Sequence, residues 1–176
     1  MTTEHTSELL EKIRGWLTGR LPQDWFTAAP EVTIDREEIL VVGSLTAPEL
    51  AADASDAERA AAVSGKIKEF RERTREQRID IASELEHRTG RKVAWGVQVG
   101  DRTELFTTLS VPVMTRLRQQ ERLVLDTLVQ AGVARSRSEA LAWCVKLVGK
   151  NADGWLADLR SAMEHVSKVR SEGPGA

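Results

Sequence analysis

The chain has 176 residues, of which 41% are hydrophobic and 30% are charged, and its formal net charge is −2 at pH 7. This hydrophobic content predicts a folded core and excludes an intrinsically disordered chain. The small negative charge excludes a protein whose whole surface is basic, and the single cysteine, Cys144, excludes an intrachain disulfide. We find no signal-peptide pattern at the N-terminus and no apolar run long enough to span a membrane, so we expect a cytoplasmic protein.

The first part of the chain predicts a small α+β domain of unknown role, which we place at residues 1–111. Apolar residues recur at helical spacing in two stretches, alternate with other residues in three, and form a continuous run, Ile39–Val42, in one more. The expected elements are a helix at 7–18, a hairpin with strands at 31–35 and 38–45, a long helix at 56–87, and strands at 93–99 and 105–111. This order of elements favours helices packed on a small antiparallel sheet.

The outer face of the expected long helix is basic, with glutamates interleaved. The basic side chains are Lys66, Lys68, Arg71, Arg73, Arg75 and Arg78, and the glutamates between them are Glu69, Glu72 and Glu76. Spacings of three and four residues favour ion pairs along a solvated face. RNA binding through this face, between Lys66 and Arg78, is the alternative interpretation.

Residues 112–171 predict a short strand followed by helices. In the strand, 113–117, alternation puts Met114, Arg116 and Arg118 on one face. A helix at 119–132 should end at Gly132, and the capping-box pattern from Ser136 to Glu139 should begin a helix at 136–150. The last helix, 151–170, carries an apolar stripe that includes Trp155, Leu159, Met163 and Val166. We expect this stripe either to lie over the two preceding helices or to pair with a second chain, and residues 172–176 to form a disordered tail.

The segments 114–117, 125–132 and 136–141 together resemble the ribbon-helix-helix family of DNA-binding proteins. The resemblance implies that strands from two chains pair as a ribbon that enters the major groove of DNA. It implies that Met114, Arg116 and Arg118 face base edges, and that the groups around Arg135, Ser136, Arg137 and Ser138 hold a phosphate. Pairing of 113–117 with the upstream strand of the same chain is the alternative, and it would preclude an intermolecular ribbon.

The distribution of charge is compatible with a nucleic-acid site in this part of the chain. Residues 113–150 include seven basic and three acidic residues, a net charge of +4 on a chain whose total is −2. A basic patch on an acidic protein is typical of a confined nucleic-acid site, and it is equally typical of ordinary surface variation.

The sequence contains no recognisable catalytic or metal-binding pattern. The three histidines, His5, His87 and His165, are far apart, and Cys144 has no histidine near it in the sequence. We therefore expect no enzymatic activity, no metal and no cofactor. The function that we expect is that of a dimeric protein that binds double-stranded DNA, as a transcriptional regulator. The alternative is a non-catalytic interaction or dimerisation module with a protein partner.

Overall fold

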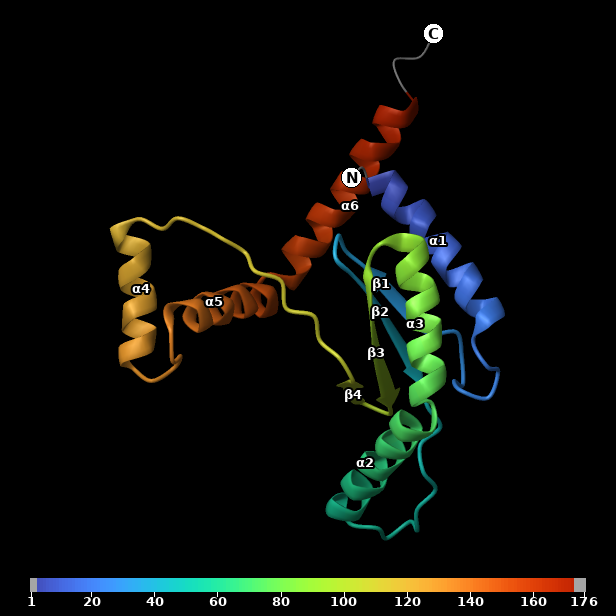
Figure 1. Ribbon diagram of the computed structural model, residues 1–176. Coiled ribbons are helices and arrows are strands. Elements are labelled where there is room, and N and C mark those ends of the chain that lie inside the picture. Colours follow the sequence, from blue (N-terminus) through green and yellow to red (C-terminus); the bar gives the residue numbers. More distant parts are fainter. Residues whose placement is uncertain (1–2, 173–176) are drawn as a thin grey trace. The chain divides into compact units, whose positions relative to one another are not determined.

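The structure is a computed structural model, and it describes residues 3–172 (Figure 1). The chain divides into two units, one comprising His5–Val111 and the other beginning at Pro112. The expected α+β class is confirmed, because a four-stranded sheet is combined with helices. None of the described helices combines the length and the apolar character needed to cross a bilayer.

The first unit is built on a sheet with the strand order β1-β2-β3-β4. The strands are β1 (Glu31–Ile34), β2 (Glu38–Ser44), β3 (Lys92–Val99) and β4 (Arg102–Leu105). The predicted hairpin of β1 and β2 is confirmed as an antiparallel pair, and β3 pairs antiparallel with β4. However, β2 and β3 are parallel. The sheet is therefore mixed rather than antiparallel as expected, because the long helical connection returns the chain to the end where β2 began.

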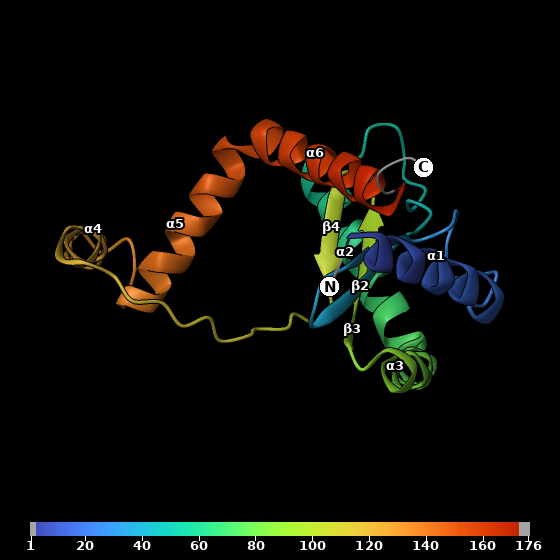
Figure 2. The same cartoon turned by 90° about the horizontal axis from the view of Figure 1, so that it is seen from above.

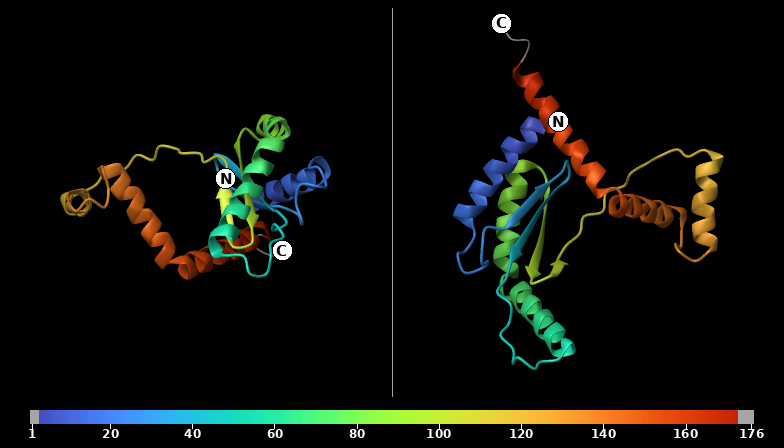
Figure 3. Two further views of the ribbon diagram at one scale, coloured as in Figure 1. Left: turned by 90° about the horizontal axis from the view of Figure 1, so that it is seen from below. Right: turned by 180° about the vertical axis from the view of Figure 1, so that it is seen from behind.

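Three helices, α1 (Thr3–Arg20), α2 (Asp56–Arg73) and α3 (Arg75–Thr89), contribute to the core on one face of this sheet. Figures 2 and 3 show α1 and α3 on the same side of the sheet. These two helices are joined by an ion pair between Arg20 and Glu84, 2.6 Å long, and by the Arg88 guanidinium, which lies over the Trp16 ring. The core follows strand alternation, since Ile39, Val41 and Val97 are fully buried.

The single long helix expected at 56–87 is wrong, because the helix breaks at Thr74. The backbone of Thr74 leaves the helical region, with φ −96° and ψ 3°. Its N–H and its hydroxyl both donate to the Phe70 carbonyl, at 3.0 and 2.7 Å. The break changes the direction of the chain between α2 and α3 (Figure 1), so that Phe70 before it and Ile81 after it both enter the same core.

An aromatic cluster fills the centre of the core. Trp25 lies edge-on to Phe70 and to Trp95, with ring centroids 5.7 and 6.1 Å apart. The Phe26 ring occupies the space that a Cβ atom on residue 43 would need, so only glycine fits at Gly43 without displacing the ring. This cluster anchors the loop between α1 and β1 to the sheet.

The second unit contains α4 (Gln119–Gln130), α5 (Arg137–Asn151) and α6 (Asp153–Glu172). The helices α4 and α5 form a hairpin whose turn has Gly132 in the left-handed region, as predicted, with φ 74°. Its buried core consists of Leu125, Ala134 and Ala140. Of the predicted tail, Glu172 is the last residue of α6, and residues 173–176 lie outside the described part of the chain.

Two of the expected strands are wrong, in whole or in part. The strand β4 ends at Leu105, and residues 107–118 have no regular secondary structure, so the strand expected at 113–117 does not form. Alternating side chains produce a strand only where a second strand completes the hydrogen-bond ladder, and no described strand pairs with 113–117. The backbone N–H of Leu109 instead donates to the Glu38 carboxylate, at 3.3 Å.

Candidate functional site

The segment expected to contact DNA bases is highly exposed. The side chain of Met114 is 96% exposed, and Arg116 and Arg118 are also exposed. Neither arginine forms an ion pair within the described chain, and the backbone N–H of Arg118 donates to the Glu121 carboxylate at the start of α4. Both guanidinium groups are therefore free to meet an anionic partner.

The turn between α4 and α5 brings the other candidate residues together, but their polar groups are largely satisfied within the chain. The Ser136 hydroxyl accepts from the N–H of Glu139 at 3.2 Å, and the Glu139 carboxylate accepts from the N–H of Arg135 at 2.7 Å. The Arg137 guanidinium makes two hydrogen bonds to the Asp126 carboxylate, which lower the pKa of Asp126. Ser138 is exposed. Two carboxylates thus occupy the region in which a phosphate was expected.

The second unit exposes far more apolar surface than the first. Among the described residues, fourteen of the nineteen exposed large hydrophobic side chains follow Val111. No described side chain of α6 is buried, although this helix is 20 residues long. A long helix without buried side chains gains little stability from packing, so its apolar face is available for another surface.

These apolar residues follow one continuous repeat along α5 and α6. Starting from Leu141, an apolar residue recurs at alternating steps of four and three residues as far as Val169. We refer to this set as the seam; it consists of Leu141, Val145, Val148, Ala152, Trp155, Leu159, Ala162, Val166 and Val169. Most of its large side chains are exposed, for example Val145 at 66% and Trp155 at 62%. The spacing is that of a coiled coil.

The spacing of the seam is present in the sequence, but it extends over two helices, so the stripe expected for either helix alone contains only part of it. Ala152 connects them, because it stands four residues after Val148 and three before Trp155. In the structure α5 ends at Asn151, and Ala152 leaves the helical region with φ −124° before α6 begins. The repeat is therefore continuous across a break in the helix.

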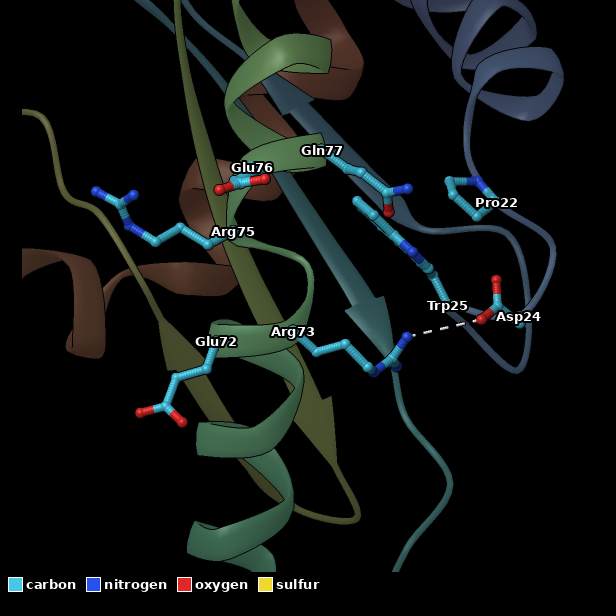
Figure 4. Close-up of a pocket in the computed structure, with 8 residues that line it drawn as sticks. All are labelled: Pro22, Asp24, Trp25, Glu72, Arg73, Arg75, Glu76 and Gln77. Atoms are coloured by element: carbon cyan, nitrogen blue, oxygen red, sulfur yellow. Dashed lines mark ion pairs between the residues drawn. The ribbon is translucent and has the colours of Figure 1, made fainter.

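The basic face of α2 and α3 is partly neutralised, as its interleaved glutamates predicted. Ion pairs join Lys66 to Glu69 at 3.9 Å and Arg73 to Glu69 at 2.7 Å. Arg73 also reaches Asp24 at 3.6 Å across a groove of 530 Å³ (Figure 4). In Figure 4, Arg73 points toward Asp24, whereas Arg75 points away from it, toward the opposite side of the helices. The groove contains charges of both signs and no described cluster of metal ligands.

Both units match known protein families. Residues 11–105 match the family described as Rv1265-like protein, N-terminal domain, and residues 118–170 match the Mb1296 C-terminal domain. The chain belongs to the Rv1265-like family. Two relatives, Mb1296 of Mycobacterium bovis and Rv1265 of Mycobacterium tuberculosis, are each 56% identical over 159 residues, covering 90% of this chain and 69% of the relative. Both are described as uncharacterized proteins, and no solved structure matches the chain.

The expected resemblance to the ribbon-helix-helix family is wrong. The helices of the second unit lie within the match to the Mb1296 C-terminal domain, except for the last two residues of α6, and no ribbon-helix-helix family is recognised. The resemblance depended on a helical hairpin whose second helix begins with a capping Ser136, and such a hairpin is common to many helical proteins. The strand that would have formed the ribbon is also absent from 113–117.

Proposed function

We propose that α5 and α6 form an association module through which two copies of this chain pair, as a non-catalytic function in the cytoplasm. The observation that carries the proposal is the seam from Leu141 to Val169, whose large side chains are exposed from Val145 onward. In α6 the seam from Trp155 to Val169 comprises two consecutive heptads of apolar residues, which is the pattern by which helices pack against one another in coiled coils. The helix α5 carries the same repeat from Leu141 to Val148, on the other side of the break at Ala152. Fully burying one large apolar side chain contributes about 1.5–3 kcal/mol, so several seam residues together can offset the cost of association.

A second copy is the partner that this pattern favours. A seam with a spacing of four and three needs a helix with the same periodicity opposite it, and a second copy supplies that helix. Leu156 and Met163 stand beside the seam and widen it, whereas Lys146, Asp153 and Arg160 lie on positions outside it. The seam is thus an apolar face with charged flanks, which suits a face covered by another helix.

Mass in solution tests this proposal directly. Size-exclusion chromatography with light scattering should give twice the 19.5 kDa mass of one chain. A monomer at high micromolar concentration would contradict the proposal. A monomer that acquires a helical partner of a different sequence would replace self-association with protein binding.

A second candidate function is the binding of double-stranded DNA by the paired chains, as a transcriptional regulator. The observation that favours it is the exposure of Arg116 and Arg118, which have no ion-pair partner in the described chain, beside the fully accessible Met114. Two copies would carry two such segments, and unpaired arginines bind phosphates and guanine edges. Fluorescence anisotropy with random duplex DNA at two salt concentrations tests this candidate, because phosphate contacts make binding weaker at higher salt.

A further inference from the structure

A cluster of three arginines in the first unit lacks negative partners. Arg71 at the end of α2 and Arg75 and Arg78 in α3 line one groove of 560 Å³, together with Phe106. None of the three forms an ion pair within the described chain, whereas Arg73, which stands between Arg71 and Arg75 in the sequence, forms two. The three positions are spaced by four and three residues, which places them on one side of a helical segment, and Arg78 reaches back across the break at Thr74 to the carbonyl of Arg71.

The guanidinium of Arg78 is held in place by uncharged groups. Its side chain is only 7% exposed. The Nε atom donates to the Thr74 hydroxyl at 2.9 Å, and Nη2 donates to the Arg71 carbonyl at 2.7 Å. The third nitrogen, Nη1, makes no hydrogen bond within the described chain. Burial lowers the pKa of Arg78, and the nearby charges of Arg71 and Arg75 lower it further.

A buried arginine is normally paired with a carboxylate, because an uncompensated charge is costly to remove from water. Here the compensation within the chain comes from the two hydrogen bonds to uncharged groups and from the aromatic ring of Phe106, whose centroid is 4.7 Å from Arg78 and 5.5 Å from Arg71. The planar guanidinium of Arg78 is therefore preorganised, and its charge has no anionic partner.

The groove also contains two carboxylates, and each has another partner. Glu72 lies 3.9 Å from Lys68, and Glu104 lies 3.0 Å from Arg102. The side chains of the groove include four cations and these two anions, so its net charge is positive. Beyond the arginines, Ile79 and Phe106 supply apolar wall, and Ser64 and Thr107 supply hydroxyl groups.

We infer that Arg71, Arg75 and Arg78 form a binding site for the phosphate group of a small phosphorylated molecule. Guanidinium forks match the oxygen geometry of phosphate, and several arginines around one groove can share its charge. The groove exceeds the size of a phosphate ion, and its apolar wall suits an organic group attached to the phosphate. This site lies in the first unit and is independent of the association module proposed for the second.

Isothermal titration calorimetry on the full chain tests this inference with two probes, inorganic phosphate and phenyl phosphate, at constant ionic strength. We expect phenyl phosphate to bind more tightly than inorganic phosphate. R71Q and R75Q should each weaken binding by about tenfold, which is the scale of one charge-assisted hydrogen bond. Both residues are exposed, so both variants should fold. The matched control is K66Q, which removes one positive charge from α2 at a position outside the groove.

Several outcomes would overturn the inference. No binding of either probe at millimolar concentration would show that the site does not exist. An equal loss of affinity in K66Q would show that the probes are attracted by the overall charge and not by this groove. Equal affinity for the two probes would mean that the site binds free phosphate and does not recognise an attached organic group. Single-stranded RNA that binds in an Arg71-dependent manner, and that phenyl phosphate does not displace, would make this face an RNA surface instead.

Discussion

Arg137 of α5 and Asp126 of α4 form a two-point ion pair, with Nε to Oδ1 at 2.6 Å and Nη2 to Oδ2 at 2.7 Å. The pair joins the two helices of a hairpin whose buried core is only Leu125, Ala134 and Ala140. The pair also engages Arg137, which the sequence suggested as a phosphate contact, in a bond within the chain. The same contact therefore bears on the stability of the hairpin and on which arginines can meet DNA.

The hairpin should loosen in acid. The hydrogen bonds from Arg137 lower the pKa of Asp126 in the folded chain. A lowered pKa means that the contribution to stability is complete above the ordinary aspartate range and is lost as the pH falls through the folded-state value. Amide hydrogen exchange in α4 and α5 should therefore accelerate from about pH 6 to about pH 3, relative to the intrinsic exchange rate. Asp126→Asn should exchange faster at neutral pH and lose most of this dependence, and an unchanged pH response would refute the assignment.

DNA binding, if it occurs, should depend on the exposed arginines. Arg116→Ala and Arg118→Ala should each weaken binding to duplex DNA and reduce the slope of log affinity against log salt by about 1. Arg137→Ala should have a smaller effect, because that guanidinium is already paired with Asp126. Fluorescence anisotropy over a salt series gives all three values. The greatest loss in Arg137→Ala would show that the ion pair opens to hold a phosphate.

Thr74 should be essential to the stability of the first unit. Its hydroxyl donates to the Phe70 carbonyl and accepts from Nε of Arg78, and the residue is fully buried. Thr74→Val keeps the shape but leaves a buried donor unpaired, at a cost of about 1–3 kcal/mol. Urea unfolding measures this loss. The control is Thr18→Val, because the Thr18 hydroxyl bonds only to the exposed Arg14 carbonyl, and equal losses in the two variants would contradict the role of Thr74.

Substitution of Gly43 should disturb the aromatic cluster. The Cβ atom of Gly43→Ala would overlap the ring of Phe26, which packs against Trp25 and Phe70. We expect a loss of about 1–3 kcal/mol, as for other overpacked cores. Gly65→Ala in α2 is the matched control, since it meets open space and should stabilise the helix by about 0.5–1 kcal/mol. Urea unfolding compares the two, and a neutral Gly43→Ala would show that the ring moves freely.

The parts of the fold that were predicted correctly are those decided by local chemistry. The hairpin of β1 and β2 was visible because apolar strand residues flank the polar turn at Asp35, whose carboxylate accepts from two backbone N–H groups. The turn at Gly132 was visible because glycine adopts a left-handed conformation at the end of a helix at little cost. The parallel pairing of β2 with β3 and the break at Thr74 depend on contacts between distant residues, which no local pattern contains.

For the candidate sites too, local sequence predicted some features, and others depended on contacts between distant residues. Exposure of Arg116 and Arg118 required the structure, because the alternation at 113–117 equally suits a paired strand. The pairing of Arg137 with Asp126 joins residues eleven positions apart on different helices. The spacing of Arg71, Arg75 and Arg78 was present in the sequence, but their contact with Phe106 and their lack of carboxylate partners were not. The spacing of the seam was present in the sequence, but its exposure was not.

The seam should be sensitive to charge at its centre. Leu159→Glu and Val166→Glu each place a carboxylate within the apolar surface of a pair of helices, where it would be desolvated without a partner. Both variants should be monomeric under conditions in which the unmodified chain is a dimer. Ser161→Glu introduces the same charge between them, outside the seam, and should remain dimeric. Light scattering distinguishes these states, and a dimeric Leu159→Glu would exclude the seam as the interface.

The most direct test of the association module is the mass of the unmodified chain in solution, measured by light scattering over a range of concentrations. Pairing through α5 and α6 predicts a mass of twice 19.5 kDa that falls to one chain on dilution. A constant mass of one chain, from a protein with its full helical content, would contradict the proposal that the seam pairs with a second copy.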